Sequence, residues 1–195
     1  MDGADAGRFV YCTPAYREML PPALKSSYRD LDDLIRRIVL SGRSRLLIVA
    51  PYLSSAGMEL LRDAITVCAS SGSWIHVVTT LRGEAAGPNL NALRSLLGGT
   101  GGGVIRSRLR IISSTDRIGA LLHAKLVIAD GRTGYLGSAN LSLRGLQDNL
   151  EVGVSLTGAQ AGSFDKMIEY LESQGLLEDQ TSLLDPPASN CTERS

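Results

Sequence analysis

The most informative part of the chain is residues 123–140, which read HAKLVIADGRTGYLGSAN. The apolar, partly β-branched run Leu121–Ala129 predicts a strand, and Asp130-Gly131 is a turn signal. A second short strand is expected over Tyr135–Ala139, so the segment predicts a β-hairpin with a five-residue loop.

Four of these polar side chains are expected to converge. His123 and Lys125 are two residues apart, so on a strand they project from the same face. Folding the chain about Arg132 brings Ser138 and Asn140 opposite them. Such a patch can hold a phosphate, because the lysine supplies charge and the hydroxyl and amide supply hydrogen-bond donors.

The spacing of these residues also forms a specific pattern. The pattern H-x-K-x4-D-x6-G-S-x-N is made by His123, Lys125, Asp130, Gly137, Ser138 and Asn140. It resembles the signature of the phospholipase D superfamily, whose members break and remake phosphodiester bonds. Gly137 would let the backbone approach the phosphate closely. Asp130, on the turn, is expected to organise the hairpin or to pair with a nearby charge.

The resemblance adds one further site residue and a mechanism. It places a glutamate eleven residues after the motif asparagine, where Glu151 stands, and a carboxylate there can fix the tautomer of His123. One motif histidine then attacks phosphorus and becomes a phosphohistidine, while a second protonates the leaving oxygen. Lys125, Ser138 and Asn140 would hold the developing charge, and the resemblance requires no metal or other cofactor.

The resemblance also bears on assembly, because the reaction needs two motifs and this chain carries one. The simplest active form is a homodimer whose active site lies at the interface and receives His123 from both chains. A heterodimer with a second motif-bearing protein stays open as an alternative.

Length and composition are typical of one compact domain. The chain has 195 residues, of which 44% are hydrophobic, and its formal net charge is zero. Residues 46–150 carry ten basic and six acidic side chains, whereas residues 151–195 carry two basic and eight acidic ones. We expect an N-terminal segment over 1–26, a catalytic domain over 27–177, and a disordered acidic tail over 178–195.

The order of predicted elements indicates an α/β fold, with a mixed sheet flanked by helices. Strands are expected at residues 45–53, 74–81, 104–113 and 151–156, and helices after Ser27 and at about 56–69, 88–97 and 160–174. Gly98–Gly103 lies before a strand and lacks a following Lys-Ser/Thr, so we interpret it as a connector and not as a phosphate loop.

Two further features of the sequence are candidates for the site. Arg106, Arg108 and Arg110 would share one face of a strand, where they either contact phosphates or are solvated. His76, the only other histidine, lacks the H-x-K context and is interpreted as structural.

Three classes of function fit these observations. The first is a nuclease that cleaves nucleic acid, since short single-motif members of the superfamily include non-specific bacterial nucleases. Residues 137–154 also look like the small phospholipase-D-like component of DISARM-type phage-defence systems. This second resemblance implies that the chain acts with partner proteins of a defence system. The second is a phospholipid hydrolase or transferase, and the third is a non-catalytic nucleic-acid-binding subunit of a defence complex.

The sequence further predicts where the protein resides. The N-terminus lacks a secretory pattern, no apolar run has membrane-spanning length, and Cys12, Cys68 and Cys191 fit neither a metal site nor a disulfide framework. We therefore expect a cytoplasmic protein that does not engage a membrane.

Overall fold

The computed structural model describes residues 10–117 and 122–185, and its centre is a nine-stranded mixed β-sheet in the order β2-β1-β8-β7-β6-β3-β4-β5-β9. The strands are β1 (Val10–Cys12), β2 (Tyr28–Asp30), β3 (Arg45–Val49), β4 (Trp74–Val78), β5 (Leu109–Ser114), β6 (Leu126–Ala129), β7 (Thr133–Gly137), β8 (Val152–Leu156) and β9 (Leu177–Asp179). Strands β3, β4 and β5 run parallel, whereas β6, β7 and β8 continue the sheet in antiparallel pairs.

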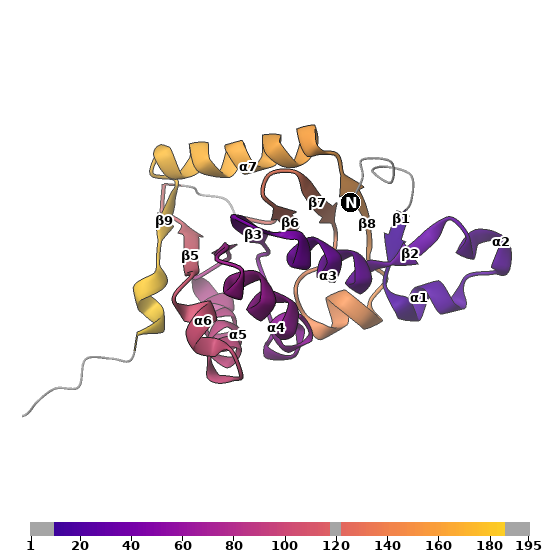
Figure 1. Cartoon of the computed structure of the whole chain (residues 1–195), viewed down its shortest axis with the longest axis horizontal. Coiled ribbons are helices and arrows are strands. Elements are labelled where there is room, and N and C mark those ends of the chain that lie inside the picture. Colours follow the sequence, from indigo (N-terminus) through magenta and orange to yellow (C-terminus); the bar gives the residue numbers. More distant parts are fainter. Residues whose placement is uncertain (1–9, 118–121, 186–195) are drawn as a thin grey trace, which may run out of the picture.

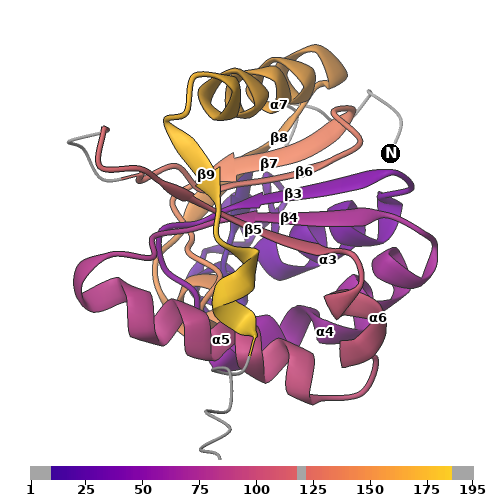
Figure 2. The same ribbon diagram turned by 90° about the vertical axis from the view of Figure 1, so that its left-hand side faces the viewer.

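Helices cover both faces of this sheet, which confirms the predicted fold class (Figure 1). They are α1 (Pro14–Met19), α2 (Pro22–Lys25), α3 (Leu31–Ser41), α4 (Ser55–Ser70), α5 (Ala86–Gly98), α6 (Gly102–Arg106) and α7 (Gly158–Ser173), with short helical turns at η1 (Gly83–Ala85), η2 (Arg144–Asp148) and η3 (Thr181–Leu184). Helices α3, α4, α5 and α6 lie on one face, and α7 lies alone on the other (Figures 1 and 2).

The two faces bury separate apolar layers. Helix α3 shows how the sequence builds the larger layer: Leu31, Leu34, Ile35, Ile38 and Val39 recur at helical spacing and are all buried. On the other face, Ile168 of α7 packs with the sheet residues that point its way. The predicted helices over 56–69, 88–97 and 160–174 are confirmed by α4, α5 and α7, and Ser54 caps α4 by accepting a hydrogen bond from the Gly57 amide at 3.1 Å.

The hairpin differs from its prediction in length and register. Strand β6 begins at Leu126 and not at Leu121, β7 spans Thr133–Gly137, and the loop has three residues, 130–132. Both Asp130 and Gly131 have positive φ, of 55° and 64°, which turns the chain two residues sooner than expected. Because β6 begins at Leu126, His123 and Lys125 precede the strand.

A second correction concerns the strand predicted over 104–113. Residues 102–106 form α6, and the strand β5 starts only at Leu109. Gly101, with φ of 78°, lets the chain turn out of α5, and Ile105 is then buried against the helical layer, so tertiary packing overrides the β propensity of Val104 and Ile105. The glycine run is thus a tight link between two helices.

The sheet also extends beyond the predicted catalytic domain at both ends. Strand β1, within the predicted N-terminal segment, pairs with β8, and β9 pairs with β5 through Leu177–Asp179. Residues 181–184 form η3, so the first part of the predicted tail is ordered, while residues 186–195 lie outside the described part of the chain.

Candidate active site

One edge of the sheet collects most of the predicted site residues. Because β6 is antiparallel to both β3 and β7, the start of β6 lies beside the ends of β3 and β7, and the start of β8 lies next to the end of β7. The Gly137 amide donates to the Lys125 carbonyl at 3.3 Å, and the Ser138 amide donates to the Val152 carbonyl at 3.0 Å. The motif residues other than Asp130 therefore lie, together with Glu151, at the edge where β6 and β8 begin and β3 and β7 end.

His123 and Lys125 contact each other directly. Lys125 Nζ lies 3.1 Å from His123 Nδ1 and 3.2 Å from Nε2, and it donates to the His123 carbonyl at 3.0 Å. The imidazole is exposed, whereas Lys125 is only 7% exposed. Burial lowers the pKa of Lys125, and the charge of Glu151 offsets part of that effect. A buried ammonium thus contacts an open imidazole, although the two residues precede the strand on which they were expected to share a face.

Ser138 and Glu151 form a second pair. Ser138 Oγ donates to Glu151 Oε2, and it also accepts from the Val152 amide at 3.1 Å. The other carboxylate oxygen of Glu151 accepts from Asn149 Nδ2 at 3.3 Å. Glu151 was expected to orient His123, but in the described part of the chain it is bonded to Ser138 and Asn149, while the imidazole contacts Lys125.

Asn140 has an unsatisfied atom. Its Oδ1 is buried and has no hydrogen-bond partner among the described residues. Such an atom costs about 1–3 kcal/mol when it is left unpaired, so it indicates a position built for a missing donor or for the amide in its rotated orientation. The neighbouring Leu141 forms an isolated parallel bridge with Leu53, which anchors this loop to the segment that follows β3.

Tyr135 is a residue that the motif does not reveal. It is buried beneath the loop, and its hydroxyl accepts a hydrogen bond from the Ala139 amide at 3.2 Å. A Cβ atom at Gly137 would collide with this hydroxyl and would lie 2.6 Å from the Val152 carbonyl. The tyrosine ring therefore gives a reason for glycine at position 137 in addition to the close approach of a phosphate that the sequence suggested. Burial, with the charge of Glu151 nearby, raises the pKa of Tyr135 and keeps the hydroxyl protonated.

Asp130 lies at the far end of β6, away from the other motif residues. Its carboxylate accepts from the amides of Arg43, Ser44 and Arg45 at 2.8–2.9 Å and from Ser44 Oγ at 2.9 Å. Burial alone would raise the pKa of Asp130, but these hydrogen bonds together hold it below its usual value. As predicted for the turn residue, Asp130 organises the hairpin, in this case by clamping it to the start of β3.

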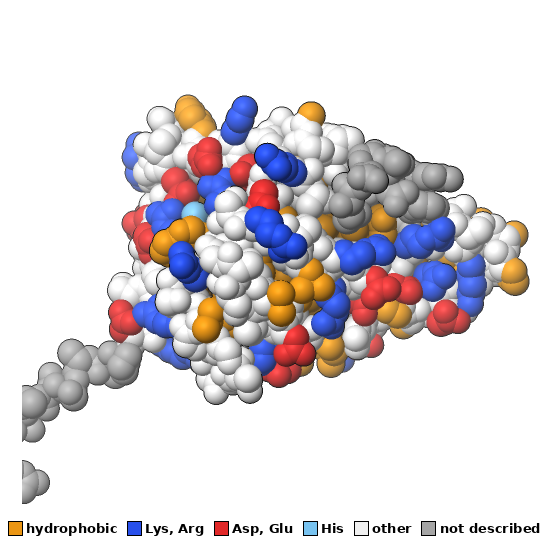
Figure 3. Space-filling view, in the orientation of Figure 1, with side chains coloured by type: hydrophobic (Ala, Val, Ile, Leu, Met, Phe, Trp, Pro, Cys, Tyr) orange, Lys and Arg blue, Asp and Glu red, His pale blue; other side chains and the backbone are white. Residues whose placement is uncertain are grey.

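The three arginines considered as phosphate contacts do not share a face. Arg106 ends α6 and pairs with Asp185, and Arg108 lies over the Trp74 ring at 5.4 Å from its centroid. Arg110, on β5, pairs with Glu172 at 2.9 Å and with Asp179 at 2.7 Å. Basic and acidic side chains are likewise interspersed over the face shown in Figure 3.

His76 lies near the ion pairs of Arg45 and Arg110, on the face covered by α7. Burial first, and then the charges of Arg45 and Arg110, lower the pKa of His76 to about 4. On β4 it lies opposite Leu47 of β3 and Arg110 of β5, within the sheet and not at the edge that holds His123.

The described residues contain no group of three or more histidine, cysteine, aspartate or glutamate side chains placed to hold a metal ion. Among the same residues, none of the helices has the length and hydropathy needed to cross a bilayer.

Comparison with known proteins decides the family. Residues 34–173, more than half of the chain, match a family described as "Cardiolipin synthase, PLD-like domain". The chain belongs to the phospholipase D superfamily. Members of this superfamily are typically phosphodiesterases. No curated protein sequence matches the chain.

Solved structures of the superfamily share the fold. Nuc from Salmonella typhimurium, a phospholipase D family member, is 17% identical with a TM-score of 0.57, over 75% of this chain and 88% of its own. NucT from Helicobacter pylori is 17% identical with a TM-score of 0.56, over 87% and 96%. A phosphatidylserine synthase from Haemophilus influenzae Rd KW20 is 17% identical with a TM-score of 0.60, over 80% of this chain but only 38% of the synthase.

Proposed function

We propose that this phospholipase D superfamily member hydrolyses phosphodiester bonds in nucleic acid, with His123 as the nucleophile and without a metal ion. One observation carries the proposal. The exposed imidazole of His123 has both nitrogens within 3.2 Å of the buried ammonium of Lys125, beside Ser138 and Asn140 at one sheet edge. A nucleophile that is open to solvent next to a fixed positive charge suits attack on a phosphodiester anion.

The proposed reaction has two steps. In the first, an imidazole nitrogen of His123 forms a bond to phosphorus while the bond to the leaving oxygen breaks, and a second imidazole gives that oxygen its proton. In the second, the neutral second imidazole takes a proton from water, the water oxygen bonds to phosphorus, and the bond to His123 breaks. Lys125, Ser138 and Asn140 stabilise the charge on the phosphoryl oxygens in both steps.

The second imidazole is proposed to come from a second copy of the chain. The sequence has two histidines, and His76 lies within the sheet on β4, near the charges of Arg45 and Arg110 on the α7 face. Around the site, Leu143, Leu150 and Val152 are 39%, 62% and 46% exposed, and the last two flank Glu151. A second copy packed across the site would bury these apolar side chains and add its own His123.

A mixing experiment tests the homodimer. Wild-type and His123→Ala chains are unfolded, mixed in varied ratios and refolded, and the hydrolysis rate is measured. If both histidines serve one site, only wild-type homodimers turn over, and the activity follows the square of the wild-type fraction. A linear dependence, or full activity from a proven monomer, contradicts the shared site.

Nucleic acid is favoured as the substrate by chain size and by the family resemblance. The match covers 88% of Nuc and 96% of NucT, so the chain has the size of these single-domain structures, and short single-motif members of the superfamily include non-specific nucleases. The resemblance of residues 137–154 to a DISARM-type component supports a role in phage defence, acting with partner proteins. A phospholipid hydrolase or transferase is the second candidate, supported by the likeness to a phosphatidylserine synthase.

The test of the proposed function is cleavage in excess EDTA. Single-stranded DNA, duplex DNA, RNA and phosphatidylglycerol vesicles are each incubated with the wild-type protein and with His123→Ala. We expect cleavage of a nucleic acid that survives chelation and requires His123. Cleavage restored only by Mg²⁺ contradicts the metal-free reaction, and cleavage of lipid alone supports the second candidate. Nucleic-acid binding without any turnover would instead indicate a non-catalytic subunit.

A further inference from the structure

A cavity of about 430 Å³ lies beside the candidate active site. Its lining includes Tyr52 and Leu53 after β3, Thr80 after β4, Glu84 in η1, and Asn89 in α5. These residues come from the same sheet edge as the motif, because β3 and β4 are parallel and end there. None of them belongs to the motif.

The cavity shares a wall with the loop that carries Asn140. Leu53 forms its isolated bridge with Leu141, and the Ser54 amide donates to the Leu141 carbonyl at 3.1 Å. The last β3–β6 pair is Val49 with Leu126, so the segments that carry Tyr52 and His123 leave the sheet at the same edge. A group bound in the cavity would therefore lie at the same sheet edge as a phosphate held at His123.

The walls of the cavity are rigid. Asn89 is fully buried, and its Oδ1 accepts from the Leu53 amide at 2.8 Å. Its Nδ2 donates to the Pro51 carbonyl at 2.8 Å, to the Thr80 carbonyl at 2.7 Å and to Thr79 Oγ1 at 3.0 Å. One amide thus ties together the chain segments that follow β3 and β4, so the cavity is preorganised.

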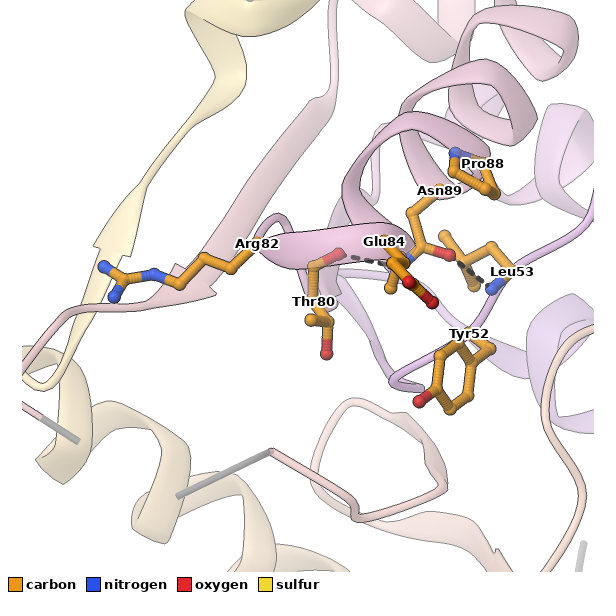
Figure 4. Close-up of a pocket in the computed structure, with 8 residues that line it drawn as sticks. Tyr52, Leu53, Thr80, Arg82, Glu84, Pro88 and Asn89 are labelled. Carbon is orange, nitrogen blue, oxygen red and sulfur yellow. Dashed lines mark hydrogen bonds between the residues drawn. The ribbon is translucent and has the colours of Figure 1, made fainter. Parts of the chain in front are cut away.

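Thr80 supplies the observation that points to a ligand. The residue is 7% exposed, and its Oγ1 is buried without a hydrogen-bond partner among the described residues. In Figure 4, Thr80 and Tyr52 extend from the chain toward the same side of the cavity, with Glu84 above the tyrosine ring. A buried hydroxyl that lines a cavity and lacks a partner is satisfied when a polar ligand occupies that cavity.

The charges around the cavity decide what kind of group fits. Arg82, the cation of the lining, extends away from Thr80 and Tyr52 and pairs with Asp116 (Figure 4). Glu84 brings a negative charge instead, which disfavours a second phosphate. Tyr52, 44% exposed, offers an aromatic face. An uncharged ring with hydrogen-bonding edges matches this set: the ring stacks on Tyr52, and its polar edge meets Thr80 Oγ1 and Glu84.

We infer that this cavity is a subsite for the nucleobase next to the scissile phosphate. The inference rests on the proposed function, and it assigns to Tyr52, Thr80 and Glu84 a role in substrate binding. It also gives the enzyme a reason to prefer nucleic acid, because a lipid acyl chain offers nothing to the unpaired hydroxyl or to the carboxylate.

The test compares diesters that differ only by a nucleoside. Thymidine 3′- and 5′-(p-nitrophenyl phosphate) and methyl p-nitrophenyl phosphate release the same coloured product. We expect wild type to have the higher kcat/KM on at least one thymidine diester, and Tyr52→Ala to reduce that preference about tenfold, the size expected for one stacked base. Tyr170→Ala, which removes an exposed tyrosine from α7, is the matched control and should leave the preference unchanged.

Thr80→Val provides a second variant with an independent signature. Valine has nearly the same shape, so the preference for the thymidine diester should fall several-fold while the melting temperature stays equal or rises, because an unpaired buried hydroxyl is removed. A melting temperature that falls together with an unchanged preference would show that the hydroxyl serves the fold, and it would overturn the assignment of Thr80.

A binding measurement tests the subsite independently of turnover. A fluorescent thymidine dinucleotide is titrated into His123→Ala protein with and without Tyr52→Ala. About tenfold weaker binding in the double variant supports the subsite even where no diester is cleaved, whereas equal binding overturns it. If the wild type cleaves every diester with the same kcat/KM, the subsite fails and the phosphodiesterase stands; if it cleaves none, the proposed function fails.

Discussion

The two ends of strand β6 hold residues of the same motif in opposite physical conditions. At its start, the His123 imidazole is exposed and Asn140 Oδ1 on the adjacent loop has no partner in the described structure. At its other end, Asp130 accepts four hydrogen bonds from residues 43–45. The sequence pattern contains all of these residues, yet the exposed and unpaired groups lie at one end and the fully bonded carboxylate lies at the other.

This difference separates the residues proposed to act on the substrate from those that hold the fold together. Polar groups with all their hydrogen bonds satisfied make a region rigid, whereas polar groups left unpaired are stabilised when a ligand arrives. Thr80 Oγ1 follows the same rule as Asn140, and both line the edge where β3 and β4 end. Substitutions can test this difference, from the His123 end of β6 to the sheet face covered by α7.

The largest effect is expected from His123→Ala. Loss of the nucleophile should lower phosphodiester turnover by about 10³-fold or more, while the fold is kept because the imidazole is exposed. His76→Ala is the matched control and should change the rate little. Initial rates and circular dichroism spectra of both variants make the comparison. A near-normal rate for His123→Ala beside a strong effect of His76→Ala would reverse the assignment of the two histidines.

Smaller losses are expected when the groups that hold the phosphate are removed. Lys125→Ala and Asn140→Ala should each lower kcat by about 10²–10³, the usual consequence of deleting one stabilising donor in an anion site. Lys166→Ala, the same substitution on the exposed surface of α7, serves as the control and should be silent. Steady-state kinetics distinguish the outcomes: if kcat holds and only KM rises, Lys125 and Asn140 bind the ground state and do not stabilise the transition state.

At the other end of β6, the effect should move from rate to stability. Asp130→Asn keeps the left-handed backbone conformation but loses the charged acceptor, so the free energy of unfolding should fall by about 1–3 kcal/mol while kcat stays within about threefold. Asp63→Asn, on the exposed side of α4, controls for the loss of one charge. Urea unfolding and kinetics are measured on the same samples. A large fall in kcat with unchanged stability would place Asp130 in the chemistry.

An effect confined to acid pH is expected from His76. Its pKa is about 4 in the folded protein and about 6.5 in the unfolded chain, so the unfolded chain binds a proton first as the pH falls. The free energy of unfolding should therefore fall by about 2–3 kcal/mol on account of His76 as the pH drops from about 6.5 to 4. Above that window the contribution of His76 should be constant. Urea unfolding across this range checks it. In His76→Gln the slope should flatten, and an unchanged slope would assign the loss to other groups.

The sequence predicted which residues gather at one sheet edge better than it predicted their contacts. The motif spacing was sufficient to bring His123 and Lys125 together, because two residues two apart stay near each other whether or not the strand reaches them. The partner of Glu151 was not predictable in this way, since its choice of Ser138 depends on how β7 and β8 align. The real β6 ends at Ala129 as predicted but begins only at Leu126, whereas the early turn at Asp130 and Gly131 shortens the loop.

Residues that support the site carried no local signal. Tyr135 reads as one apolar position of a strand, and Asn89 as one polar position of a helix. Their roles depend on contacts across the sheet, to Ala139 in the first case and to the segments after β3 and β4 in the second. A search for polar residues within predicted buried faces could have singled out Asn89, because a fully buried amide must find several partners.

The most direct test of the central claim is to trap the covalent intermediate. The protein is mixed with a nucleic-acid substrate, quenched in alkali within the first turnovers, digested, and analysed by mass spectrometry. The account predicts a substrate fragment joined through phosphorus to His123, stable in alkali, lost in acid and absent from His123→Ala. Turnover with no fragment on His123, or with the fragment on another residue, would contradict it.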